Sequence, residues 1–107
     1  MSRSLEELSE LLSRVETILS ERNGIVGDKD WYMLKLQEEL GELTAEYLRL
    51  TGRKKQKSDP ALTRRALEDE AADLLAMLML FARRSNIDLE AALERKWFQY
   101  LGREGVK

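Results

Sequence analysis

Apolar residues recur every three or four positions along most of the chain, which is the spacing of one face of an α-helix. In the first segment this spacing runs through Leu8, Leu11, Leu12, Val15, Ile18 and Leu19. Ser4 and Glu7, placed ahead of this run, have the spacing of a capping box, in which each side chain bonds the backbone N–H of the other residue. We therefore predict a helix over residues 4–22 that ends before Gly24.

The same spacing predicts three further helices, at residues 30–50, 60–84 and 89–102. The apolar stripe of the second helix is formed by Met33, Leu36, Leu40, Leu43, Tyr47 and Leu50. Asp59 is suited to the N-cap and Pro60 to the first position of the third helix. Asp88 is the expected N-cap of the fourth. No segment shows the alternation of a strand, so the predicted fold class is all-α, with a four-helix bundle as its architecture.

The third helix contains an uninterrupted apolar run, residues 74–82, that covers its whole circumference. A surface helix needs only one apolar stripe. Because four helices from 107 residues do not easily surround one of their number, we expect the bundle to form a homodimer or homotetramer. The alternative is a monomer in which this helix is simply central.

Composition narrows the possible functions. The 107 residues suffice for one domain, and 43% hydrophobic with 36% charged residues is typical of a folded protein. The net charge of −2 gives no basic field for a nucleic-acid polymer. No apolar run is long enough to span a membrane, no basic amphipathic helix suits a membrane surface, and no signal peptide is evident. We therefore expect a cytoplasmic protein.

The chain contains no cysteine and no histidine. Disulfides, thiolate metal sites and cysteine nucleophiles are excluded, as are imidazole ligands and histidine bases. Any catalysis must therefore use carboxylates, lysine, arginine, tyrosine, hydroxyl groups or a metal ion held by oxygen.

Two acids of the third helix lie on its apolar side. Since an α-helix turns by about 100° per residue, Glu70 falls about 60° from Leu67, and Asp73 falls between Met77 and Leu80. Burying an ionised carboxylate costs several kcal/mol or more unless something compensates its charge. A basic side chain, a proton or a metal ion is therefore expected beside these acids.

The second helix repeats this arrangement. Glu39 falls at the edge of its apolar stripe, and Glu42 follows three residues later on the same face. If the two helices pack antiparallel, both pairs converge. Four carboxylates form a hard, oxygen-only site that suits Mg²⁺, or Mn²⁺, and a phosphate-bearing ligand. The alternative is that basic residues neutralise them; the candidates are Lys35, Arg64, Arg65, Arg83 and Arg84.

These residues also resemble the signature of a known family. Residues 38–42 (Glu-Glu-Leu-Gly-Glu) followed by residues 70–73 (Glu-Ala-Ala-Asp) are similar to the EExxE…ExxD signature of the MazG-like, all-α nucleotide pyrophosphohydrolases. The resemblance covers about residues 31–96. It implies an oligomeric four-helix bundle that uses Mg²⁺ to hydrolyse a nucleoside triphosphate between its α and β phosphates, releasing pyrophosphate.

Residue roles are implied by the same resemblance. It implies that the metal ligands are Glu39, Glu42, Glu70 and Asp73. Glu38, the first acid of the signature, is implied as a ligand to a further metal or as the residue that orients the attacking water, and Glu38 and Glu39 are the predicted catalytic residues. Independently of the resemblance, a metal-bound hydroxide is the natural nucleophile in a chain without histidine, and Glu38 or Glu46 is a candidate to assist it.

Three residues are predicted to bind the nucleotide substrate. Lys96 and Arg103 resemble basic positions that contact phosphates in relatives, although Tyr100 stands where relatives often have asparagine. Trp31, at the entry to the helix that bears the first acids, is the best candidate to stack on a base. The alternative for Lys96 is an ordinary surface lysine, and the alternative for Trp31 is a tryptophan of the core.

Two other functions compete with this one. Residues 70–75 also resemble phosphoribosyl-ATP pyrophosphohydrolase, but that family usually has Tyr-His where this chain has Ala76 and Met77. The third possibility is a non-catalytic helical oligomerisation module whose acids pair with lysine and arginine. The sequence does not specify the base or sugar of the substrate.

Overall fold

A computed structural model describes residues 2–24, 27–55 and 59–102 of the chain. The described part is all-helical and contains no strand. Its elements are α1 (Leu5–Asn23), α2 (Lys29–Leu50), α3 (Pro60–Arg84), α4 (Leu89–Lys96) and the short 3₁₀ helix η1 (Phe98–Tyr100). The all-α prediction is therefore confirmed.

The predicted caps are present at three helix starts. The Ser4 N–H donates to Glu7 Oε1 at 2.7 Å, and the Glu7 N–H donates to Ser4 Oγ at 3.1 Å, which completes the capping box. Asp59 Oδ1 accepts from the backbone N–H of Ala61 at 2.7 Å, with proline at the first helical position. Asp88 caps α4. These side chains supply acceptors for N–H groups that the helix itself leaves unpaired.

The predicted fourth helix is too long. Its α-helical part ends at Lys96, and the chain continues as the 3₁₀ helix η1 instead of reaching Gly102. Trp97 has φ −113° and ψ −44°, which departs from α-helical geometry. Bulky aromatic residues favour a helix less than the preceding leucine and alanine residues do. Tertiary packing does not compensate, because Trp97 is exposed.

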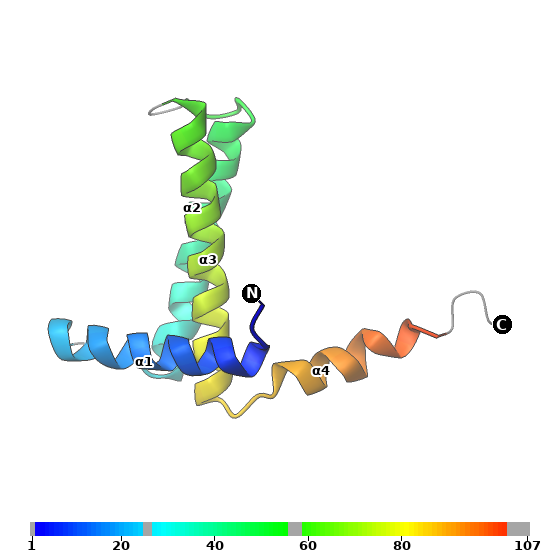
Figure 1. Cartoon of the computed structure of the whole chain (residues 1–107). Coiled ribbons are helices and arrows are strands. Elements are labelled where there is room, and N and C mark those ends of the chain that lie inside the picture. Colours follow the sequence, from blue (N-terminus) through cyan, green and yellow to red (C-terminus); the bar gives the residue numbers. More distant parts are fainter. Residues whose placement is uncertain (1, 25–26, 56–58, 103–107) are drawn as a thin grey trace.

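Helices α2 and α3 form a long antiparallel hairpin, and α1 crosses this hairpin near the end where α2 begins and α3 finishes (Figure 1). The most buried apolar side chains gather at that crossing; they are Tyr32, Met79, Leu80 and Ala82. The core thus lies at one end of the hairpin, while α4 projects away from it (Figure 1). We call α4 with η1 the arm.

A polar contact joins the three long helices at the crossing. The Tyr32 hydroxyl of α2 donates to Glu16 of α1, and Arg84 of α3 lies 3.0 Å from the same Glu16 oxygen. Burial, followed by the hydrogen bond to Glu16, raises the pKa of Tyr32 above its ordinary value. Gly27 lies so close to the Tyr32 ring that an added Cβ would sit 3.0 Å from it. The contact of Glu16 with Tyr32 and Arg84 fixes the position of α1 across the hairpin.

The single chain is open. Its radius of gyration is 17.2 Å, whereas a compact chain of this length has about 13 Å. Its accessible surface is 8297 Å², whereas about 6,100 Å² is expected for a compact monomer of this mass. Among the described helices only α2 and α3 lie along each other, so the described part of one copy does not close a four-helix bundle. In the described part of the chain no helix is long and apolar enough to cross a bilayer.

Candidate metal centre

Three of the predicted ligands meet between α2 and α3. One carboxylate oxygen from each of Glu39, Glu70 and Asp73 lies within 4.8 Å of the other two. Glu39 comes from α2, and the other two lie one turn apart on α3. We call these three residues the acid group. The antiparallel pairing of the two helices brings them together, as the helical angles predict.

The acid group runs from a buried end to an exposed end. Glu39 faces α3 and is only 7% exposed, Glu70 is half-buried, and Asp73 is exposed. A ligand can therefore approach from the side of Asp73, while Glu39 forms the floor. This geometry is suited to an ion that shares its remaining positions with a molecule from solvent.

The carboxylates of the acid group disfavour one another's charge. Burial, followed by the charge of the neighbouring Glu42, raises the pKa of Glu70 to about 7. Burial also raises the pKa of Glu39, and the charges of Glu42 and Asp73 add to this effect. Without a cation, full ionisation of the group is therefore unfavourable near neutral pH.

No lysine or arginine among residues 2–24, 27–55 and 59–102 pairs with the acid group. Four basic side chains pair with other acids: Lys35 with Glu38, Arg49 with Glu46, Arg64 with Glu68, and Arg84 with Glu16. In the same part of the chain Glu39 Oε2 and Glu70 Oε1 are buried without a hydrogen-bond donor. Because buried polar atoms are normally satisfied, these two oxygens call for a proton or a cation.

The donor set decides which cation fits. Three carboxylates with no nitrogen or sulfur ligand form a hard oxygen site, which suits Mg²⁺ or Mn²⁺ rather than zinc or copper. Mg²⁺ is commonly held by one or two carboxylates together with waters and phosphate oxygens. The residues present therefore fit such an ion, with positions to spare for a ligand.

Two predicted site residues lie beside the acid group and not in it. Glu42 is outside the set of three, although its charge contributes to the raised pKa of Glu70. The side chain of Glu38 is 53% exposed and pairs with Lys35 Nζ at 2.5 Å. That pair also raises the pKa of Lys35. The metal role of Glu42 and the catalytic role of Glu38 stay predictions.

Of the three predicted substrate-binding residues, the structure describes Trp31 and Lys96, and neither belongs to the acid group in one copy. Trp31 packs edge-on against Tyr32, with 5.0 Å between the ring centroids. Lys35 Nζ lies 5.5 Å from the centroid of the Trp31 ring. Lys96 stands on the arm, which points away from the hairpin (Figure 1). Arg103 lies outside the described residues. Their substrate contacts stay predictions.

Two charged contacts were not anticipated from the sequence. Arg49 is 8% exposed, and its Nη1 lies 2.6 Å from Glu46 Oε2. This pairing occupies Glu46, which had been a candidate to assist the nucleophile. The sequence feature that could have revealed the pair is the spacing of three residues between opposite charges on one helix. The second contact is that of Glu16 with Tyr32 and Arg84. The sequence feature that could have revealed it is an acid in the helical spacing of apolar residues, four positions after Leu12 and three before Leu19.

Comparison of the chain with protein-family models, with curated proteins and with solved structures finds no match in any of the three. Any functional assignment therefore depends on the geometry and chemistry of the acid group.

Proposed function

We propose that this protein is a Mg²⁺-dependent nucleoside triphosphate pyrophosphohydrolase. The observation that carries the proposal is the acid group, which joins two helices, lacks a basic partner in the described chain and contains two buried oxygens without donors. A purely structural cluster would be expected to recruit lysine or arginine, because unpaired buried charge is costly. Here the nearby cations are paired elsewhere.

The proposed reaction adds water across one phosphoanhydride. The oxygen of the water forms a bond to phosphorus as the bond between the α and β phosphates breaks, giving a nucleoside monophosphate, pyrophosphate and a proton. When bound, Mg²⁺ would neutralise phosphate charge and polarise the phosphorus under attack. Glu39, Glu70 and Asp73 would hold the ion, with Glu42 as a fourth ligand. Glu38 would orient the attacking water.

Self-association belongs to the same proposal. Met33, Leu40 and Tyr47 recur every seven residues along α2, and each is exposed in one copy. A seven-residue repeat of apolar side chains is typical of a helix that packs lengthwise against other helices. The surface in excess of a compact monomer is about 2,200 Å², which is the size of a stable interface. A second hairpin on this stripe would complete a four-helix bundle.

The test measures pyrophosphate release from a panel of ribo- and deoxynucleoside triphosphates and phosphoribosyl-ATP, with Mg²⁺ and with a chelator. We expect Mg²⁺-dependent release from at least one triphosphate. Glu70→Gln should abolish it, because the variant loses a ligand charge. Glu68→Gln is the matched control, since Glu68 lies on the same helix in an exposed pair with Arg64.

The rival functions give different results. Release from phosphoribosyl-ATP alone would favour that activity. A non-catalytic module would release no pyrophosphate from any substrate and would bind no Mg²⁺ in calorimetry. Full activity of Glu70→Gln would refute the assignment of the acid group, whatever the substrate.

A further inference from the structure

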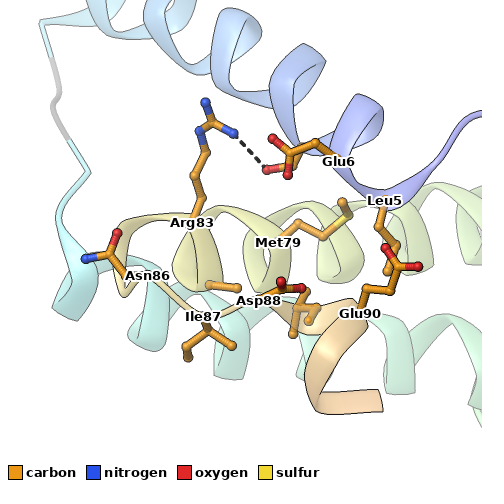
Figure 2. A pocket seen from close by; sticks show the side chains of 11 residues that line it. Leu5, Glu6, Met79, Arg83, Asn86, Ile87, Asp88 and Glu90 are labelled. Carbon is orange, nitrogen blue, oxygen red and sulfur yellow. Dashed lines mark hydrogen bonds between the residues drawn. The ribbon is translucent and has the colours of Figure 1, made fainter. Parts of the chain in front are cut away.

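A groove separate from the acid group lies at the C-terminal end of α3, where α1, α3 and the start of α4 meet (Figure 2). Its volume is about 310 Å³. Apolar side chains, including Leu5, Met79 and Ile87, alternate in its lining with the acids Glu6, Asp88 and Glu90. Its lining is therefore partly apolar and partly polar; the three acids outnumber the one basic residue, Arg83, and we call them the rim acids.

Two of the rim acids are not neutralised. Asp88 is occupied as the N-cap of α4, and the basic lining residue, Arg83, donates to Ser9 Oγ at 3.2 Å. Glu6 and Glu90 form no ion pair within the part of the chain that the structure describes. The groove therefore suits an occupant that is both apolar and positively charged.

The end of the arm has those properties. Trp97 is 64% exposed, and Phe98 and Leu101 are also exposed. Arg95 and Lys96 precede them in the last turn of α4, and neither forms an ion pair within the described residues. The arm thus carries exposed aromatic surface next to two positive charges, which is the complement of the groove.

An arm cannot occupy the groove of its own copy. Leu89 and Glu90, at the start of α4, line the groove, while Trp97 follows the last residue of the same helix. An eight-residue helix is rigid and about 12 Å long, so it holds its two ends apart. The complementary surfaces can therefore meet only between copies.

We propose that two copies exchange arms, so that the α4 helices lie antiparallel and each arm end docks in the other copy's groove. Arg95 and Lys96 of one copy then face Glu6 and Glu90 of the other, and Trp97 covers the apolar lining. The contact is the same in both directions, as a two-fold axis requires. Leu93, midway between residues 90 and 96, lies nearest that axis.

This interface is small. Two short helices bury less than the 1,200 Å² or so at the lower end of stable complexes, and exposed ion pairs add only about 0–1 kcal/mol each. The arm exchange is therefore weak by itself and depends on protein and salt concentration. It involves Lys96, a predicted substrate contact, but no residue of the acid group, so its failure leaves the assignment of the acid group untouched.

Cysteine cross-linking tests the exchange in the full chain, which has no cysteine of its own. Chains carrying Glu90→Cys are mixed with chains carrying Lys96→Cys, oxidised gently and separated on non-reducing gels. We expect several-fold more dimer in the mixture than with either chain alone, and a disulfide-linked homodimer of Leu93→Cys. Thr51→Cys, exposed at the far end of the hairpin, is the control. Circular dichroism verifies that each variant is folded.

Charge reversal adds an independent test. Arg95→Glu should reduce cross-linking through Leu93→Cys, and Glu90→Arg in the opposing chain should restore it. Cross-linking no greater than that of the Thr51→Cys control would overturn the proposal. So would cross-linking through Leu40→Cys alone, because it would place the copies hairpin to hairpin without arm exchange.

Discussion

Replacing Glu70 with glutamine should stabilise the metal-free protein and remove its stabilisation by Mg²⁺. The reason is that Glu70 has a raised pKa, near 7, in the folded chain, against 4.5 for an ordinary glutamate. A raised pKa means that the folded state holds the proton more tightly than the unfolded state. Stability is therefore lost as the pH rises from the ordinary pKa through the raised one, and the loss is complete above it.

The magnitude can be worked out from this shift. A difference of about 2.5 pKa units corresponds to roughly 3 kcal/mol at pH 8. Because the acid group opens to solvent at Asp73, screening reduces this to about 1–2 kcal/mol. Glutamine keeps the shape without the charge, so the variant should gain that amount at pH 8. At pH 4 the wild-type carboxyl is largely protonated in both states, and the two proteins should match.

Adding Mg²⁺ should reverse the order. An ion at one hundred times its dissociation constant stabilises the folded state by about 2.7 kcal/mol. The wild type should gain this, whereas Glu70→Gln should gain little. Urea unfolding followed by circular dichroism, at fixed protein concentration with chelator or Mg²⁺, measures both effects. Glu68→Gln should follow the wild type throughout.

Two results would refute this reasoning. One is a Glu70→Gln protein that is less stable than the wild type at pH 8 in chelator, because the carboxylate would then be stabilising without a metal ion. The other is equal stabilisation of both proteins by Mg²⁺, because the ion would then bind elsewhere.

Four further substitutions test the packing of the helices, each by thermal unfolding against the wild type. Arg49→Ala should cost about 3 kcal/mol, because it leaves Glu46 without its 2.6 Å partner; a cost below 1 kcal/mol would mean that the pair is not buried. Gly27→Ala should cost about 1–3 kcal/mol, since its Cβ would lie 2.8 Å from the Trp31 ring and 3.0 Å from the Tyr32 ring, whereas Gly41→Ala, with open space around it, should gain about 1 kcal/mol. Tyr32→Phe should cost about 1–2 kcal/mol by removing the hydrogen bond to α1; an unchanged melting temperature would contradict that role.

Periodicity and caps were sufficient to predict where the helices begin. The Ser4 and Glu7 pair, Asp59 and Asp88 all cap as predicted, because a cap depends only on a few neighbouring residues. The end of α4 was predicted less well. Trp97 and Phe98, which follow it, are exposed in one copy, and helical spacing alone does not reveal whether a side chain will be covered by other parts of the fold.

Helical angles predicted the three acids that meet, together with one that stays outside the group. Glu39, Glu70 and Asp73 lie on or beside apolar faces in the sequence and meet in the structure. The angles did not separate Glu42 from this set, because a one-dimensional pattern contains no information on the register between two helices. The register places Glu42 next to the acid group and outside it.

The sequence by itself determined an all-helical chain with oxygen-only chemistry, because periodicity and residue types are local properties. The tertiary structure decided which charges meet across helices: Arg84 of α3 meets Glu16 of α1, while the acid group of α2 and α3 has no basic partner in the described chain. It also decided the direction of the arm, through a turn in which Asn86 has φ 57° and the Ile87 N–H donates to Ala82 O at 2.8 Å. Pairing and direction depend on distances between helices, which no spacing along one helix can specify.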